Sequence, residues 1–129
     1  MYQNEDPDFT KNPIKTWFID IETYSPGDFP VPDKAADTIN VMTIYDTITE
    51  KFTTWGLHPL TKPIDNCNYI HCETEHILLE KFLAFMEQDA PDILSGWNSE
   101  FFDIPYIVNR IARVFGEDAC HRLSPVGTI

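Results

Sequence analysis

The chain has 129 residues, 43% of them hydrophobic, which is enough for one domain with a buried core. Nine basic against 21 acidic residues give a net charge of −12, which argues against a general nucleic-acid clamp but not against a metal site, because bound cations reverse the local charge. Three cysteines, an odd number, favour free thiols in a reducing compartment, and no run is apolar enough for a membrane span or a signal peptide.

The N-terminal part of the chain combines an arm with a first strand. Residues 1–14 are polar, acidic and interrupted by proline, which predicts a flexible acidic arm. Residues 16–22 then form an apolar strand that carries Asp20 and Glu22. Residues i and i+2 of a strand point to one face, roughly 6.5–7 Å apart, so these carboxylates repel each other and favour a cation between them. The alternative is a strand end that frays into solvent, and the spacing of the two acids alone does not decide between this and a cation site.

The rest of the chain alternates strand-like runs with amphipathic helices. This order predicts a mixed α/β fold, with a hairpin at the edge of the sheet and a parallel crossover in its second half. The predicted elements are a turn-rich loop (25–37), two hairpin strands (39–46 and 50–57), a short strand (69–72), a helix (74–90), a short buried strand (92–97) and a second helix (101–116).

The two helices have recognisable ends and apolar stripes. Thr74 is a plausible N-cap of the first helix, which Pro91 closes, and Gly116 ends the second. The residues predicted to face the core are Ile77, Leu78, Phe82, Phe85 and Met86 in the first helix, and Ile104, Ile107, Val108, Ile111 and Phe115 in the second.

A second polar cluster follows the short buried strand. The loop after that strand presents Asn98, Glu100 and Asp103 as the second helix begins. Ligand sites of α/β sheets lie beyond the carboxyl ends of strands, which places this loop beside Asp20 and Glu22 if the two strands are neighbours. Asp103 is also a favoured N-cap residue, so a capping role is the simpler interpretation when this loop is taken alone, and it is compatible with a role beside Asp20 and Glu22.

The text around these two acid clusters resembles a known family. "FIDIET" followed some eighty residues later by "NSEFFD" is similar to the first two exonuclease motifs of family B DNA polymerases. The flanking text "SPGDFP", "IPYIVNRI", "FGE" and "RLSP" resembles the enzymes of T-even-type bacteriophages. The resemblance covers residues 15–125, nearly the whole chain.

The resemblance implies a ribonuclease-H-like fold, a mixed sheet flanked by helices, and a proofreading 3′-to-5′ exonuclease that acts during viral DNA replication. It also implies two Mg²⁺ ions, or Mn²⁺, held by carboxylates in the way hard cations prefer. In this interpretation Asp20 bridges both ions, Glu22 serves the ion that activates water, and Asp103 serves the ion at the leaving group.

The resemblance further assigns Phe29, Asn98 and Phe102 to DNA binding. An aromatic residue in a surface loop is a candidate stacking platform, but Phe29 could equally fold back on the core, and Asn98 could be a turn residue that satisfies its own backbone. The implied partners are the 3′ end of single-stranded or primer–template DNA and the remainder of the polymerase. The implied location is the cytoplasm of an infected bacterium, with no secretion and no membrane association.

Some expected features of the family do not occur in the sequence. The third exonuclease motif, Tyr-x-x-x-Asp, is missing, so residues 15–129 are expected to be the N-terminal part of the exonuclease domain, with little activity alone. A catalytically incomplete structural or interaction fragment is the main alternative. A zinc module is a weaker one, because the metal-prone residues lack the paired C-x-x-C spacing of structural zinc sites: Cys67, His71, Cys72 and His76.

Overall fold

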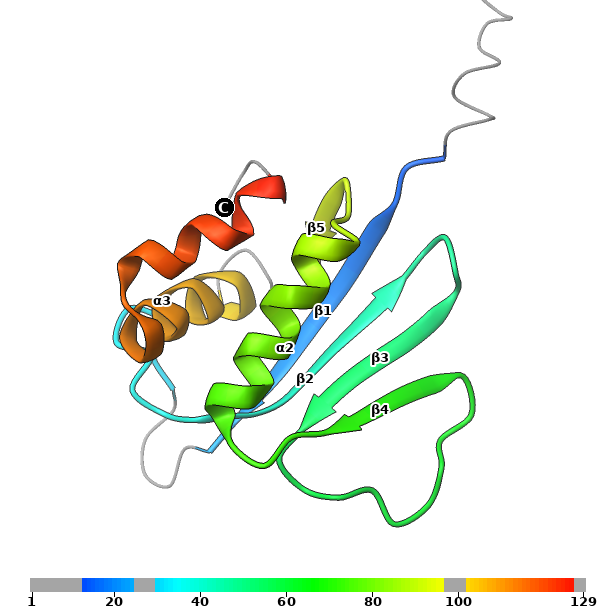
Figure 1. Ribbon diagram of the computed structural model, residues 1–129, viewed down its shortest axis with the longest axis horizontal. Helices are drawn as coiled ribbons and strands as arrows, with labels where there is room; N and C mark the ends of the chain where they lie inside the picture. The colour runs from blue at the N-terminus through cyan, green and yellow to red at the C-terminus, as the bar shows by residue number, and fades with distance from the viewer. Residues whose placement is uncertain (1–12, 25–29, 97–101, 127–129) are drawn as a thin grey trace, which may run out of the picture.

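The computed structural model describes residues 13–24, 30–96 and 102–126, so most of the predicted arm lies outside the described residues. The described chain folds into a five-stranded mixed sheet with helices packed against it (Figure 1), which confirms the predicted α/β class. In spatial order the strands are β4 (Cys67–His71), β3 (Lys51–Gly56), β2 (Ile39–Asp46), β1 (Thr16–Thr23) and β5 (Ile93–Ser95).

Strand β1, which lies between β2 and β5, alternates between two environments. Trp17, Ile19 and Ile21 are buried and face the core, whereas Phe18 on the opposite face is 47% exposed. This alternation is the period-2 pattern that the sequence predicts for a half-buried strand. The strand runs one residue further than predicted, to Thr23.

The hairpin of β2 and β3 is organised by the carboxylate of Asp46. Its Oδ1 accepts hydrogen bonds from the backbone N–H groups of Ile48 (2.8 Å) and Thr49 (3.2 Å) in the turn. Its Oδ2 accepts one from the buried indole of Trp17 at 3.1 Å and lies 3.4 Å from Lys15 Nζ. These four contacts lower the pKa of Asp46 against the opposing effect of burial, which is the largest single influence on it.

The predicted edge of the sheet is wrong, because the hairpin is internal. β4 pairs in parallel with β3 and forms the edge, and it spans Cys67–His71 where the sequence predicted 69–72. Its apolar content is too low to define its ends from sequence. The ring of Tyr69 lies close to Gly56 of β3, and its Cζ would be 2.8 Å from a Cβ at that position, so any other residue there would displace the ring.

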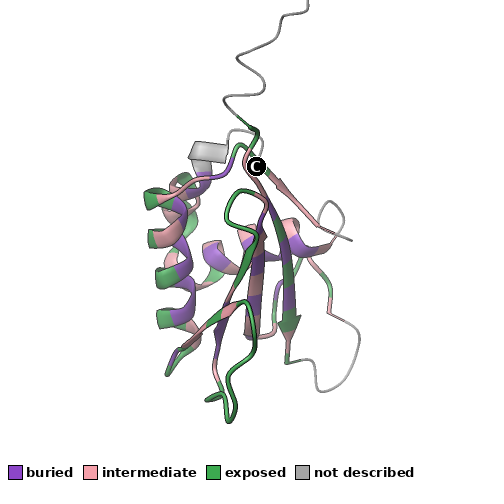
Figure 2. Ribbon diagram, turned by 90° about the vertical axis from the view of Figure 1, so that its right-hand side faces the viewer, coloured by how far each residue is buried: buried purple, intermediate pink, exposed green. Residues whose placement is uncertain are grey.

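Helix α2 (Glu75–Gln88) lies across one face of the sheet (Figure 1). Thr74 is its N-cap, as predicted, with its side-chain oxygen accepting from Ile77 N–H at 3.2 Å. Exposed and buried positions divide the helix at the left of Figure 2 into an outer and an inner side. Ile77 is 37% exposed, so its predicted place in the apolar stripe is wrong, because it lies next to the cap on the outer side. The buried positions are Leu78, Leu79, Phe82, Leu83 and Met86.

Helix α3 (Ile104–Phe115) ends at Gly116, whose φ of 98° favours glycine, and leads into the 3₁₀ helix η3 (Glu117–Val126). Ile107 and Ile111 are buried as predicted, and Ile104, Val108 and Phe115 are partly buried against the core. Tyr106 is also fully buried, although the sequence pattern gave no sign of it.

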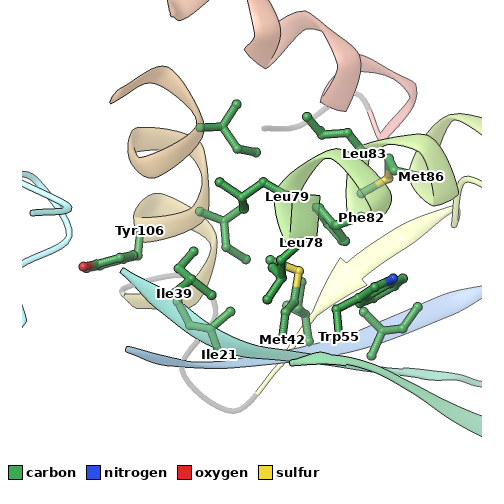
Figure 3. Packing of buried hydrophobic residues seen from close by; sticks show 14 of the residues in the cluster. Ile21, Ile39, Met42, Trp55, Leu78, Leu79, Phe82, Leu83, Met86 and Tyr106 are labelled. Atoms are coloured by element: carbon green, nitrogen blue, oxygen red, sulfur yellow. The ribbon is translucent and has the colours of Figure 1, made fainter. Parts of the chain in front are cut away.

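The core lies between the sheet and the helices (Figure 3). Trp17 stacks on Phe85 of α2 with ring centroids 5.4 Å apart, and Trp55 of β3 meets Phe85 and Phe82 edge-on at 5.5 and 5.8 Å. These aromatic contacts fix how α2 crosses β1 and β3. Within the described residues, no helix has the length and apolar character needed to cross a bilayer.

Candidate active site

The first two acids project from the face of β1 that is turned away from the core. Asp20 and Glu22 occupy the exposed positions of the strand pattern, and the buried Ile21 lies between them. The prediction that both side chains share one face is therefore confirmed. In the cross-strand register they lie opposite Thr43 and Val41 of β2.

The third acid reaches β1 from the start of α3. β5 pairs with β1 as far as Phe18, and beyond that residue no strand among residues 13–24, 30–96 and 102–126 pairs with this edge of β1. In a β-strand, the N–H and C=O groups of successive residues point alternately to the two edges. The carbonyl of Lys15 accepts from the N–H groups of Asp92 and Ile93, so the odd-numbered residues of this strand point toward β5. The N–H of Ile21 points the same way, and the carboxylate of Asp103 accepts it. Asp103 thus takes the place that a continued β5 would have taken.

Asp103 occupies the N-cap position of α3, as predicted, but its side chain does not cap the helix. Asp103 precedes α3, but its backbone is helical (φ −62°, ψ −52°) and its side chain makes no capping hydrogen bond. Pro105 in the first turn has no N–H to satisfy, which reduces the need for a cap. The side chain of Asp103 therefore bonds to β1 and not to the backbone of α3.

Asp20 and Asp103 come close enough to influence each other electrostatically. Asp103 is 3% exposed, and burial together with the neighbouring charge of Asp20 raises its pKa to about 6, although the hydrogen bond from Ile21 opposes the change. Across the parts of the chain that the structure describes, no lysine or arginine forms an ion pair with Asp20, Glu22 or Asp103. Two neighbouring carboxylates that form no ion pair with a described lysine or arginine create an environment that favours a bound cation.

The donor set fits a hard cation, and the fit is best for Asp20 and Asp103. Their oxygens are the ligand type that Mg²⁺ prefers, and Mg²⁺ commonly needs only one or two carboxylates because it keeps several waters. Among residues 13–24, 30–96 and 102–126, no three His, Cys, Asp or Glu side chains are grouped tightly enough to hold a metal. Glu22 is on the correct face of β1 but does not complete such a group.

The predicted DNA-binding residues fall partly outside the described structure. Phe29 and Asn98 lie outside the described residues, as does Glu100. Phe102 is half-buried, one residue before Asp103, with its ring centroid 5.5 Å from that of Tyr106. Of the three, only Phe102 is therefore placed beside the acids.

The residues of the weaker zinc interpretation have other contacts. His71 Nε2 lies 3.2 Å from the carbonyl of Leu57, and Cys72 is buried. The ring of His76 packs on Phe115 with centroids 4.5 Å apart. These contacts direct the side chains away from a shared centre.

A separate cleft of about 550 Å³ opens between the β2–β3 hairpin and the C-terminal end of α2. Its lining includes Asp46, Lys51, Phe85 and Asp89, and none of the predicted site residues. The hairpin turn adjoins the first residue of β1, whereas the acids lie in its second half, so the cleft and the acids are at opposite ends of the strand.

Comparison with known proteins agrees with the geometry. Residues 2–127 match the exonuclease domain of DNA polymerase family B. The DNA-directed DNA polymerase of Escherichia phage RB69 is 36% identical over 92% of this chain and 16% of that protein. The corresponding enzyme of Enterobacteria phage T4 is 32% identical over 78% of this chain and 14% of its own length.

The similarity extends beyond phages. The DNA polymerase delta catalytic subunit of Caenorhabditis elegans is 33% identical over 76% of this chain and 9% of that subunit. The chain therefore spans less than a fifth of the length of each of these relatives.

Proposed function

The chain belongs to the exonuclease domain of family B DNA polymerases, and from this premise we propose that it removes mismatched nucleotides from single-stranded 3′ ends of DNA. The observation that carries the proposal is the approach of Asp103, from the start of α3, to Asp20 on β1. Two acids from elements more than eighty residues apart are held together at the cost of their repulsion, and a bound cation offsets that repulsion.

The acids of the chain have distinct roles in this proposal. Asp20 and Asp103 lie close enough to influence each other electrostatically and would hold Mg²⁺, and the exposed Glu22 would complete the site from the same face of β1 as Asp20. When bound, such ions supply activation of water and stabilisation of the leaving 3′ oxygen. Asp103 has to be ionised for this role, and its raised pKa of about 6 makes ionisation steeply dependent on pH just below neutrality.

Substrate contacts in the proposal come from both sides of the acids. Phe102 adjoins Asp103 and presents a partly exposed ring, which suits stacking against a base. Phe29 and Asn98 are proposed to contribute by the same family resemblance. The net charge of −12 provides no general attraction for DNA, so binding depends on the cations and on stacking.

The setting of the activity is also part of the proposal. The phage relatives suggest a viral polymerase working in the cytoplasm of an infected bacterium, with the remainder of the polymerase and primer–template DNA as partners.

The test uses a 5′-labelled single strand with Mg²⁺ or Mn²⁺. The chain is incubated alone and together with the part of a matching phage polymerase that follows the aligned region. We expect little trimming by the chain alone, stepwise shortening from the 3′ end with the complement, and loss of shortening in Asp20→Ala. Shortening that persists in Asp20→Ala, or that starts from the 5′ end, overturns the proposal.

A further inference from the structure

One row of side chains across the sheet is aromatic on the face turned away from the core. Paired residues of neighbouring strands point to the same face, so the strand register defines rows that cross the sheet. Phe18 of β1 pairs with Tyr45 of β2, and Tyr45 pairs with Phe52 of β3. Ser95 of β5 and Cys67 of β4 extend this row to the two outer strands. The three residues Phe18, Tyr45 and Phe52 are named the aromatic row.

The aromatic row lies at the surface of the described structure. Phe18 and Phe52 are 47% and 41% exposed, and Tyr45 is partly exposed, with its ring centroid 4.8 Å from that of Phe52. Neighbouring strands lie about 4.8 Å apart, so the row forms an apolar stripe roughly 10 Å long. Ile93 of β5 is also exposed and shares this face, because it pairs with Thr16 of β1.

The helices pack on the opposite face of the sheet. In Figure 3, α2 and α3 both lie on one side of the strands, with the buried core between the helices and the sheet. The aromatic row points to the other side, because Phe18 alternates with the buried residues Trp17 and Ile19. No helix in the part of the chain that the structure describes covers the row.

The row departs from the pattern of a sheet face that is exposed to water. Such a face normally carries polar side chains that alternate with the buried apolar ones. The next row follows this rule, since Asp20 lies beside Thr43 and Thr54, whose hydroxyl oxygens are 3.0 Å apart. Aromatic side chains on three adjacent strands instead favour a second layer packed against the sheet.

The charges on this face decide which partner it suits. In the described strands, its positions include the acids Asp20 and Glu22 but no lysine or arginine. A DNA backbone requires basic side chains, so the row does not suit DNA. A second copy of the chain would bring together two molecules of net charge −12, with acids beside the row in both. A polypeptide with an apolar surface and no excess of acids fits best.

We propose that the aromatic row is a contact surface for the remainder of the polymerase, an apolar segment of which packs across Phe18, Tyr45 and Phe52 as a second layer on the sheet. The matched region covers only 16% and 14% of the two phage polymerases, so most of the polypeptide of these relatives lies outside it. Phe18 precedes Asp20 by two residues on the same face, roughly 7 Å along the strand, so the segment lies beside the acids. This inference rests on the proposed function for the identity of the partner, and it concerns assembly and not the chemical step.

The matched variants each remove one exposed apolar side chain without changing the charge. Phe18→Thr and Phe52→Thr remove rings of the row and keep a β-branched residue, which suits a strand. The control Ile64→Thr makes a similar change in the loop before β4, where Ile64 is exposed and lies outside the row. Urea unfolding of each chain alone, followed by tryptophan fluorescence, reports whether the variants remain folded.

The assay measures retention of the partner by the full 129-residue protein. The tagged chain is coexpressed with the part of a matching phage polymerase that follows the aligned region, and the complement that copurifies is quantified. We expect Phe18→Thr and Phe52→Thr to reduce retention about tenfold, as for aromatic residues at the centre of an interface, and Ile64→Thr to change it less than about twofold.

Hydroxyl-radical footprinting of the wild-type protein tests the same surface without any variant. We expect Phe18, Tyr45 and Phe52 to be oxidised in the chain alone and protected in the complex, with Ile64 oxidised equally in both. A row that serves only to stabilise the sheet through its cross-strand contacts gives a different result. The variants then lose stability to urea while retention and oxidation stay unchanged, which overturns the inference.

The remaining outcomes separate this inference from the proposed function. Equal retention by all variants, with 3′ shortening of labelled DNA intact, overturns the aromatic-row inference alone. Retention that depends on the row but gives no shortening overturns the proposed function alone. A wild-type chain that retains no complement overturns the inference, whereas Mn²⁺ binding to the acids still tests the nuclease site. A chain that sediments as a dimer, or binds oligothymidylate, in a manner lost in Phe52→Thr also overturns it.

Discussion

Replacing Asp103 with asparagine tests how the buried acid is held. Asp103→Asn keeps the shape of the side chain and an oxygen that can accept from Ile21 N–H, but it cannot ionise. Because the folded pKa lies above the ordinary value of 3.8, protonation favours the folded state. The contribution of protonated Asp103 to stability is full below about pH 3.8 and is lost as the pH rises through 6. The wild-type protein should therefore lose stability relative to Asp103→Asn as the pH rises.

The size of the effect follows from the pKa. A change from 3.8 to about 6, at about 1.4 kcal/mol per pH unit, gives about 3 kcal/mol. Above pH 7, without divalent metal, we expect Asp103→Asn to exceed the wild type in free energy of unfolding by up to about 3 kcal/mol. The gain is reduced by the weaker hydrogen bond that an uncharged acceptor makes.

Urea unfolding followed by tryptophan fluorescence measures this difference, because Trp17 and Trp55 are buried. Titrations run at several pH values between 4 and 8 in EDTA, with Asp65→Asn, a change on an exposed loop, as the control for charge. Adding Mg²⁺ at pH 7.5 should stabilise the wild type and not Asp103→Asn. A gap between wild type and Asp103→Asn that stays constant from pH 4 to pH 8 refutes the reasoning.

Three further predictions concern the scaffold and use the same unfolding assay. Asp46→Ala should destabilise the protein by about 2–4 kcal/mol, because the buried carboxylate bonds the hairpin turn and Trp17. Since the pKa of Asp46 is lowered, this loss of stability should shrink as the pH falls below 3.8. A loss of stability that does not depend on pH contradicts this prediction. Gly56→Ala should lower the free energy of unfolding by about 1–3 kcal/mol, because a Cβ at this position displaces the ring of Tyr69. The double variant Gly56→Ala with Tyr69→Ala should lose less stability than the sum of the two single variants, and full additivity contradicts the clash. Thr74→Ala should cost about 1 kcal/mol through loss of the α2 cap, whereas Thr74→Ser should be nearly neutral; equal losses would exclude capping.

Much of the fold follows from local pattern. The alternation in β1, the two hairpin strands and the cap and stop of α2 all appear at or near their predicted positions, because each depends on residues adjacent in sequence. The parallel crossover that places β5 beside β1 also follows from element order. This adjacency is what allowed the two acid clusters to be placed side by side.

The features that sequence did not predict depend on contacts between distant segments. The N–H of Ile21 bonds to Asp103, which lies more than eighty residues further along the chain, and nothing in the local sequence of either residue indicates this pairing. The contacts of Tyr106 and Arg110 with residues 35–37 are likewise not predictable from local sequence, because both side chains bond to backbone atoms that every loop sequence shares.

The claim that Asp20 and Asp103 share one cation is tested most directly by Mn²⁺ broadening of amide signals in a ¹H–¹⁵N spectrum. Paramagnetic broadening identifies the amides nearest the bound ion, independently of catalysis. The account predicts that low Mn²⁺ concentrations broaden Ile21 and Asp103 first, and that Asp20→Asn removes the effect. Broadening centred on another acidic group, such as Glu80 and Glu87, or broadening of Ile21 and Asp103 that persists in Asp20→Asn, would contradict the account.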